Sequence, residues 1–107
     1  MRTETAVDRL SGLAQASRLE IFRQLVQAGP EGLAAGASAE ALAIPKPTLS
    51  FHLAQLERAG LVASRRDGRS ILYRADYDSI AELVGFLYDN CCGRGSACAP
   101  RPRRTKA

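Results

Sequence analysis

The stretch PTLSFHLAQLERAGLVASRRDGRSILYRAD, residues 47–76, decides the fold that the sequence predicts. Its first half carries three leucines at the spacing of a buried helix face: Leu49, Leu53 and Leu56. Gly60 suits the end of that helix. Asp67-Gly68 then separates two runs of high β-propensity, and this dipeptide favours a tight hairpin turn because the turn needs positive φ. We therefore expect a helix over residues 47–59, followed by a β-hairpin.

Hydrophobic spacing predicts four more helices. One begins at SRLE (17–20), a capping-box pattern, and stops at Gly29-Pro30. Ser38 is the expected N-cap of the next, and the glycine-rich stretch EGLAAGA (31–37) is expected to be a loop. The five predicted helices cover residues 3–14, 18–28, 39–43, 47–59 and 75–91. The third and fourth, joined by a tight turn, have the outline of a helix-turn-helix motif.

Opposite the leucines, the fourth helix presents a small, polar and basic face without a carboxylate. Such a face can enter a DNA major groove, where Thr48 and Gln55 can hydrogen-bond base edges and Phe51 can contact a thymine methyl group. Packing against a neighbouring element is an equally good interpretation of Phe51. His52 lies nearer the leucines and is expected to be a structural histidine. The predicted DNA contacts of this segment are Lys46, Pro47, Thr48, Ser50, Phe51, Gln55 and Arg58.

The predicted hairpin carries three arginines around its tip, Arg65, Arg66 and Arg69. They are either solvated loop charges or, following a helix-turn-helix, a wing that contacts the phosphate backbone or the minor groove. The charge distribution favours the second interpretation. The chain of 107 residues has a net charge of +4, and residues 44–74 are predominantly basic, which points to a surface for a polyanion.

Hydrophobic residues make up 46% of the chain and charged residues 24%, the balance of an ordinary globular domain. No apolar run is long enough for a membrane span, and the N-terminus has no signal-peptide core, so we expect a cytosolic protein without a membrane partner. In a reducing compartment three cysteines are poor material for a disulfide framework. The predicted organisation is a winged helix domain over 1–92, a ligand-binding segment over 93–98 and a disordered basic tail over 99–107.

The combination of these motifs resembles the ArsR/SmtB family of winged helix-turn-helix repressors. The similarity covers about residues 7–90 and rests on four patterns, which are LAQASRLEIFRQL (13–25), S-x-H-L (50–53), A-G-L-V (59–62) and R-x-G-R-x-x-x-Y (66–73). It implies a mainly α fold with a two-stranded hairpin wing, an α+β architecture in the order ααααββα. It also implies a homodimer through the first and last helices, binding to double-stranded operator DNA, and release from DNA when an effector binds.

All the cysteines lie near the end of the chain, in YDNCCGRGSAC (88–98). The helix over 75–91 is expected to end at Cys91, and the glycines after Cys92 permit a reversal that brings Cys98 back. Three thiolates suit a soft, thiophilic ion, and trivalent arsenic or antimony prefers three sulfurs, whereas zinc would need a fourth ligand. We therefore expect As(III) or Sb(III) as the effector at Cys91, Cys92 and Cys98, and no organic cofactor. Redox sensing by these thiols and a cluster without a function remain open.

The resemblance implies two usual effector sites, a C-x-C pair in the third helix and a zinc site of histidine and carboxylates on the fifth. Both are missing here, because the predicted third helix has no cysteine and the fifth has no histidine. A small thiol arsenate reductase would need a C-x5-R loop, yet the sixth residue after Cys92 is Cys98. With a single histidine, acid–base catalysis also lacks its usual parts. We therefore expect a regulator and not an enzyme.

Overall fold

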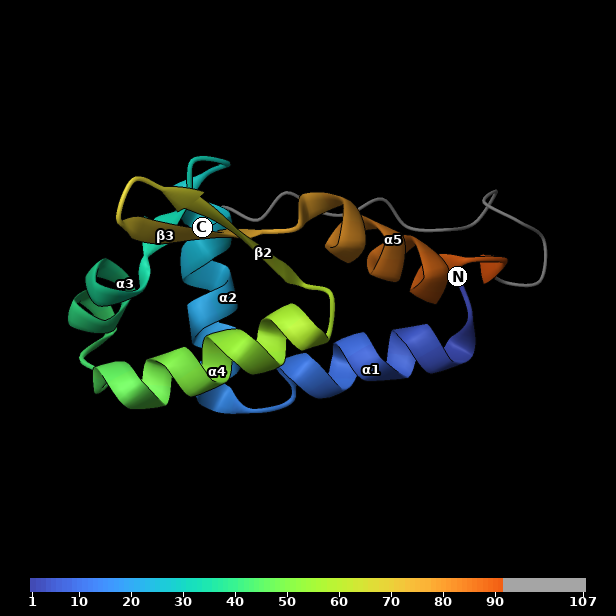
Figure 1. Ribbon diagram of the computed structural model, residues 1–107. Coiled ribbons are helices and arrows are strands. Elements are labelled where there is room, and N and C mark those ends of the chain that lie inside the picture. Colours follow the sequence, from blue (N-terminus) through green and yellow to red (C-terminus); the bar gives the residue numbers. More distant parts are fainter. Residues whose placement is uncertain (92–107) are drawn as a thin grey trace.

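Residues 1–91, the part of the chain that the computed structural model describes, form five helices and three strands (Figure 1). Their bounds are α1 (Thr3–Leu13), α2 (Ala16–Ala28), β1 (Leu33–Ala34), α3 (Ala35–Leu42), α4 (Lys46–Arg58), β2 (Val62–Asp67), β3 (Ser70–Ala75) and α5 (Tyr77–Tyr88). This is the predicted winged helix-turn-helix, with α3 and α4 as the helix-turn-helix and β2–β3 as the wing. None of these helices is long and apolar enough to cross a membrane.

Helix α4 is held by its leucine face, as predicted. Leu49, Leu53 and Leu56 are each at most 1% exposed and belong to one hydrophobic core with α2. At the C-terminal end, the Gly60 N–H donates to the Glu57 carbonyl and the Leu61 N–H donates to the Leu56 carbonyl, both at 3.0 Å. With Gly60 at φ +82°, these bonds form a Schellman motif, which turns the chain directly into β2.

The sheet has three strands and not the predicted two, in the antiparallel order β1-β3-β2. Strand β1 lies in the stretch that was expected to be a loop, and it pairs Leu33 with Tyr73 and Ala34 with Leu72. Two residues are too few to show alternation in a sequence. Gly32 enables the pairing, because it adopts φ +80° and a Cβ there would lie 2.5 Å from the Tyr73 carbonyl oxygen.

The predicted starts of α2 and α3 are wrong. Helix α2 is capped by Gln15, whose Oε1 accepts from the Arg18 N–H at 2.9 Å, so Ser17 lies inside the helix. Helix α3 begins at Ala35, and Ser38 is buried within it, where its hydroxyl donates to Gln24 Oε1 at 2.5 Å. In α2, Gln15 takes the place of the expected serine cap. In α3, the Ser38 hydroxyl is used in a hydrogen bond to α2 and caps no helix.

Helix α5 is shorter at both ends than predicted. Asp76 caps its start by accepting the Ser79 N–H at 3.1 Å. After Tyr88 the backbone leaves the α-helical conformation, with Asp89 at φ −56° and ψ 131° and Asn90 left-handed at φ +58°, so Cys91 follows the helix instead of closing it. Asparagine tolerates the left-handed conformation, and the apolar spacing that predicted a longer helix continues to Cys91 although α5 has already ended.

Replacing Gly32 by alanine should destabilise the fold more than replacing Gly68 by alanine. Both glycines have positive φ, but an added Cβ meets nothing within 4 Å at Gly68, whereas at Gly32 it meets the Tyr73 backbone. We expect a loss of about 1 kcal/mol for Gly68→Ala and about 2–4 kcal/mol for Gly32→Ala. Thermal unfolding followed by circular dichroism measures both, and equal melting temperatures would contradict the close approach of β1 to β3.

Candidate nucleic-acid interface

The outward face of α4 carries most of the side chains that were predicted to contact DNA. Lys46, Pro47, Thr48, Ser50, Phe51 and Arg58 are exposed, and Gln55 is half-buried. Phe51 is 58% exposed, so the alternative that it is buried against a neighbouring element of the same chain is wrong. The carboxylate of Glu57 is engaged at the flank, where it accepts the Ser64 hydroxyl at 2.9 Å. The outward face therefore offers hydrogen-bonding, apolar and cationic groups without a facing acid.

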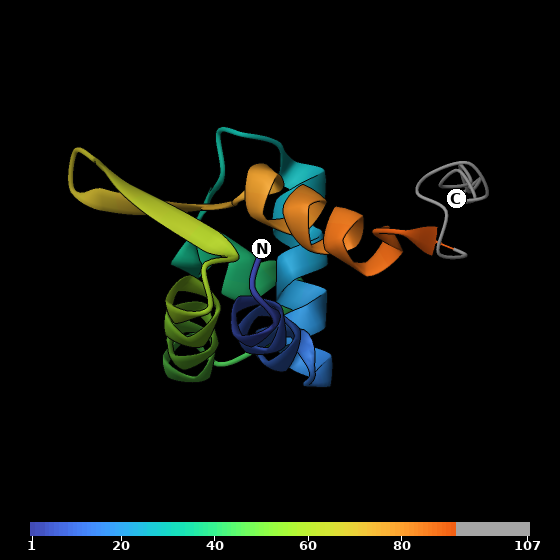
Figure 2. The same cartoon turned by 90° about the vertical axis from the view of Figure 1, so that its right-hand side faces the viewer.

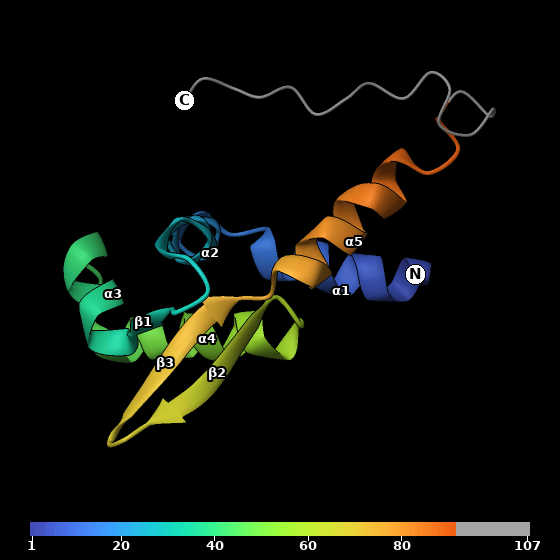
Figure 3. The same ribbon diagram turned by 90° about the horizontal axis from the view of Figure 1, so that it is seen from above.

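The wing projects from the body of the molecule beside α4 (Figure 2). Six paired positions join β2 and β3, from Val62–Ala75 to Asp67–Ser70. Arg65, Arg66 and Arg69 are exposed near its tip, as predicted. Arg65 also donates from Nη2 to the Glu31 carbonyl at 3.3 Å, which fastens the wing to the loop before β1. The roles of the three arginines in DNA binding stay predictions. In the view from above, the wing and α4 overlap (Figure 3).

His52 connects the outward face of α4 with the core. It is 8% exposed, as expected for a structural histidine, and its ring lies 5.8 Å from the ring of Phe51. However, its buried Nδ1 has no hydrogen-bond partner within residues 1–91. Burial, reinforced by the positive charge of Arg18, lowers the pKa of His52 below its ordinary value of 6.5. The neutral imidazole is therefore the form compatible with the packed helix.

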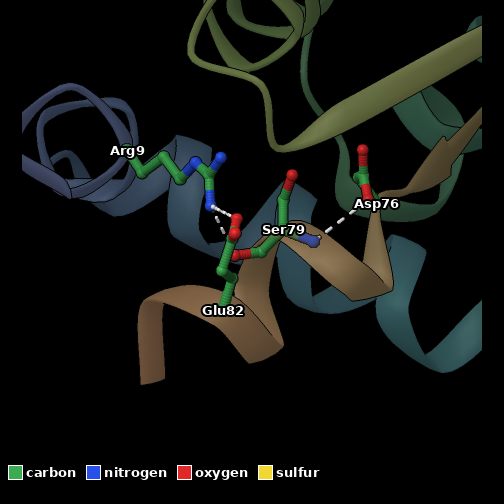
Figure 4. Close-up of polar contacts among 4 residues, drawn as sticks. All are labelled: Arg9, Asp76, Ser79 and Glu82. Atoms are coloured by element: carbon green, nitrogen blue, oxygen red, sulfur yellow. Dashed lines mark hydrogen bonds and ion pairs between the residues drawn. The ribbon is translucent and has the colours of Figure 1, made fainter. Parts of the chain in front are cut away.

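Arg9 joins the two terminal helices, a contact that the sequence analysis missed. Its guanidinium Nη1 donates to the Ser79 carbonyl at 2.9 Å and to the Glu82 carboxylate at 3.0 Å (Figure 4). The Arg9 side chain is only 14% exposed, and a Cβ on Gly60 would lie 4.0 Å from its Nε. Arg9 thus connects α1 and α5 next to the turn that ends α4. Partners about 70 residues apart leave no signal in a single sequence.

Of the three predicted ligand cysteines, only Cys91 lies in the described part of the chain, where it is half-buried. Cys92 and Cys98 lie outside the described residues. Within residues 1–91 no group of three or more histidine, cysteine, aspartate or glutamate side chains could hold a metal ion. A site for a thiophilic ion would therefore have to recruit Cys92 and Cys98.

An exposed, carboxylate-free helix face beside an arginine-bearing hairpin defines the class of protein as a winged helix-turn-helix DNA-binding regulator. Comparisons with known proteins agree. A helix-turn-helix domain profile matches residues 13–65. The nodulation protein NolR of Rhizobium meliloti is 36% identical over 86 residues, covering 80% of this chain and 68% of NolR. A biofilm growth-associated repressor of Agrobacterium fabrum is 37% identical over 90 residues, covering 84% and 74%.

Solved structures show the same fold. An ArsR-like transcriptional regulator from Rhodococcus matches with a TM-score of 0.72 at 27% identity, over 78% of this chain and 76% of that chain. A homodimeric DNA-binding domain from Mycobacterium bovis, a possible ArsR-family regulator, matches with a TM-score of 0.67 at 31% identity, over 78% and 75%. A possible transcriptional regulator for arsenical resistance matches with a TM-score of 0.66 at 30% identity, over 75% and 80%.

The chain belongs to the ArsR/SmtB family of winged helix-turn-helix transcriptional repressors, which bind DNA. Because its relatives and its fold neighbours are transcriptional regulators, the prediction that it is not an enzyme is confirmed. The family and the winged helix were therefore both predicted correctly from the motifs of residues 13–25 and 47–76.

The stability of the protein should fall as the pH drops from about 7.5 to 5.5. The unfolded chain takes up a proton on its only histidine near pH 6.5, whereas folded His52 resists protonation, so the unfolded state binds more protons in this range. Urea unfolding at stepped pH measures the loss, and His52→Gln should remove it. An NMR titration of the His52 ring with a midpoint at or above 6.5 would contradict the interpretation.

Proposed function

We propose that the protein is a homodimeric repressor that leaves its operator when trivalent arsenic or antimony binds Cys91, Cys92 and Cys98. The observation that carries the proposal is the position of Cys91, three residues after the end of a helix whose apolar side is exposed beside α1. A ligand at this position would act where two subunits meet. DNA binding itself follows from the family.

The dimer is supported by apolar surface that a single chain leaves uncovered. Helices α1 and α5 lie side by side (Figures 1 and 3), and Arg9 links them. Their large apolar side chains that are at least 42% exposed are Val7, Leu10, Val84, Leu87 and Tyr88. Large apolar side chains exposed on two adjoining helices are typical of a subunit interface. The Mycobacterium bovis neighbour with the same fold is a homodimer, which supports the same arrangement here.

Replacing Leu87 by glutamate should yield a monomer with much weaker operator binding. Leu87 is 60% exposed in the single chain, so the substitution leaves the subunit core unchanged but places a charge in the proposed interface. Light scattering after size-exclusion chromatography gives the mass in solution. Ile71→Glu, at a 42% exposed position on the wing, is the control and should remain dimeric. A dimeric Leu87→Glu variant would exclude α5 from the interface.

The choice of effector rests on the chemistry of the thiols. Three thiolates without a nitrogen or carboxylate ligand suit a soft ion, and the carboxylates of α5 form no metal-binding group within residues 1–91. The fold neighbour described as a possible regulator for arsenical resistance supports the same class of ligand. A two-thiol site would also accept a methylated arsenical, so the contribution of Cys98 determines the ligand class.

The contacts of α1 supply a route from the cysteines to α4, the reading helix, which is the helix predicted to contact DNA bases. Arg9 ties α1 to α5, and Gly12 packs so closely on the end of α4 that an added Cβ would lie 2.8 Å from Ala59 Cβ. A change at the end of α5 can therefore re-angle α4 through α1. Coupling between effector and DNA of about 1–3 kcal/mol would weaken operator binding by roughly one to two decades.

Replacing Cys91, Cys92 and Cys98 together by serine should leave operator binding intact and abolish release by arsenite. A gel shift with an operator duplex, titrated in parallel with arsenite, zinc and peroxide, measures this. Release of the wild-type protein by arsenite alone supports the proposal, and release by peroxide alone would indicate a redox sensor instead. If arsenite still releases the triple variant from the operator, the assignment of the cysteines as the effector site is wrong.

A further inference from the structure

A hollow of about 290 Å³ lies where the wing meets the helix-turn-helix. Three segments that are far apart in the sequence line it, namely the junction of β1 and α3, the start of α4, and the wing from its turn into β3. Its lining residues are Ala34, Ala35, Gly36, Lys46, Arg69, Ser70, Ile71 and Tyr73. The hollow therefore brings a side chain of the reading helix and a side chain of the wing to one place.

The charged groups that line the hollow are two cations, Lys46 and Arg69, and the lining contains no carboxylate. Both side chains are exposed, and within residues 1–91 neither takes part in an ion pair or a side-chain hydrogen bond. Two unneutralised cations around one small space repel each other unless an anion lies between them. The hydroxyl of Ser70 adds a neutral donor to the same space.

The position of Lys46 strengthens the case for an anion. Its Nζ lies 4.0 Å from where a Cβ on Gly36 would be, so the ammonium group lies over the first turn of α3. That turn has no acidic residue, and its N-cap, Ala34, offers no side-chain acceptor. The positive end of the α3 dipole and the Lys46 charge thus have the same sign at short range. An anion in the hollow would be attracted by both.

We propose that this hollow is the binding site, or shared seat, of a single DNA backbone phosphate that contacts both Lys46 of α4 and Arg69 of the wing. The inference rests on the DNA-binding function, because the hollow opens between the two elements that are predicted to contact DNA. Lys46 and Arg69 were predicted as separate contacts, one on the helix and one on the wing. In the shared seat they hold one phosphate, so the angle between wing and reading helix is set by a single nucleotide.

The salt dependence of DNA binding distinguishes a shared phosphate from two separate ones. The slope of log affinity against log salt is about −0.9 per neutralised phosphate. The DNA for this test is a duplex that the wild-type protein selects from a random library. We expect the double variant Lys46→Gln, Arg69→Gln to reduce the magnitude of the salt slope by about 0.9 per subunit. Two separate phosphates would instead give about 1.8 per subunit, and that result would overturn the proposal.

Methylphosphonate substitution at one phosphate at a time locates the contact. We expect one position per half-site at which the neutral linkage makes Lys46→Gln and Arg69→Gln both silent. Arg66→Gln, at an exposed wing residue outside the hollow, is the matched control and should keep its effect at that position. If different positions silence Lys46→Gln and Arg69→Gln, or none silences both, the shared seat is excluded. Failure of the wild-type protein to bind any duplex would instead refute the proposed function.

Discussion

The fold depends on the division of α4 into a buried leucine side and an outward side of polar and exposed residues. Leu49, Leu53 and Leu56 are buried against α2 and the start of the wing, and their burial leaves the opposite side of the helix facing outward. Each fully buried leucine contributes about 1.5–3 kcal/mol of transfer free energy. The outward side adds little to stability and is therefore free to carry a phenylalanine and polar side chains. The same rigid packing fixes the directions in which those side chains point.

Helix α1 is joined to α4 by a steric contact and to α5 by a polar one. Gly12 lets α1 lie directly on Ala59, at the end of α4, and Arg9, one turn earlier on α1, binds α5. Helix α1 is thus in contact with both the end of α4 and α5, the helix that precedes the cysteines. Packed interfaces of this kind adopt discrete arrangements and do not deform continuously. A displacement of α5 would therefore be transmitted as a change of packing and not absorbed locally.

The parts of the fold that were predictable are those with local signals. The leucine stripe, Gly60 and Asp67-Gly68 each act within a few residues, and the structure confirms the helix, its stop and the hairpin that they predicted. Strand β1 was not predictable, because it exists only through pairing with β3, some 40 residues later. The exposure of the side chains that are predicted to contact DNA follows from the helix wheel, whereas the Arg9 bridge and the Lys46–Arg69 hollow are products of tertiary packing.

The end of α5 at Tyr88 has a consequence for how proteins of this kind diversify. Asp89 and Asn90 separate Cys91 from the helix, so the thiol does not belong to the 3.6-residue repeat that positions Leu83 in the core. If the segment after Asn90 binds the effector, as proposed, its ligand atoms lie outside the helical repeat that positions the core side chain of α5. Under the proposed function, selection can exchange one inducer for another while the DNA-reading scaffold stays as it is.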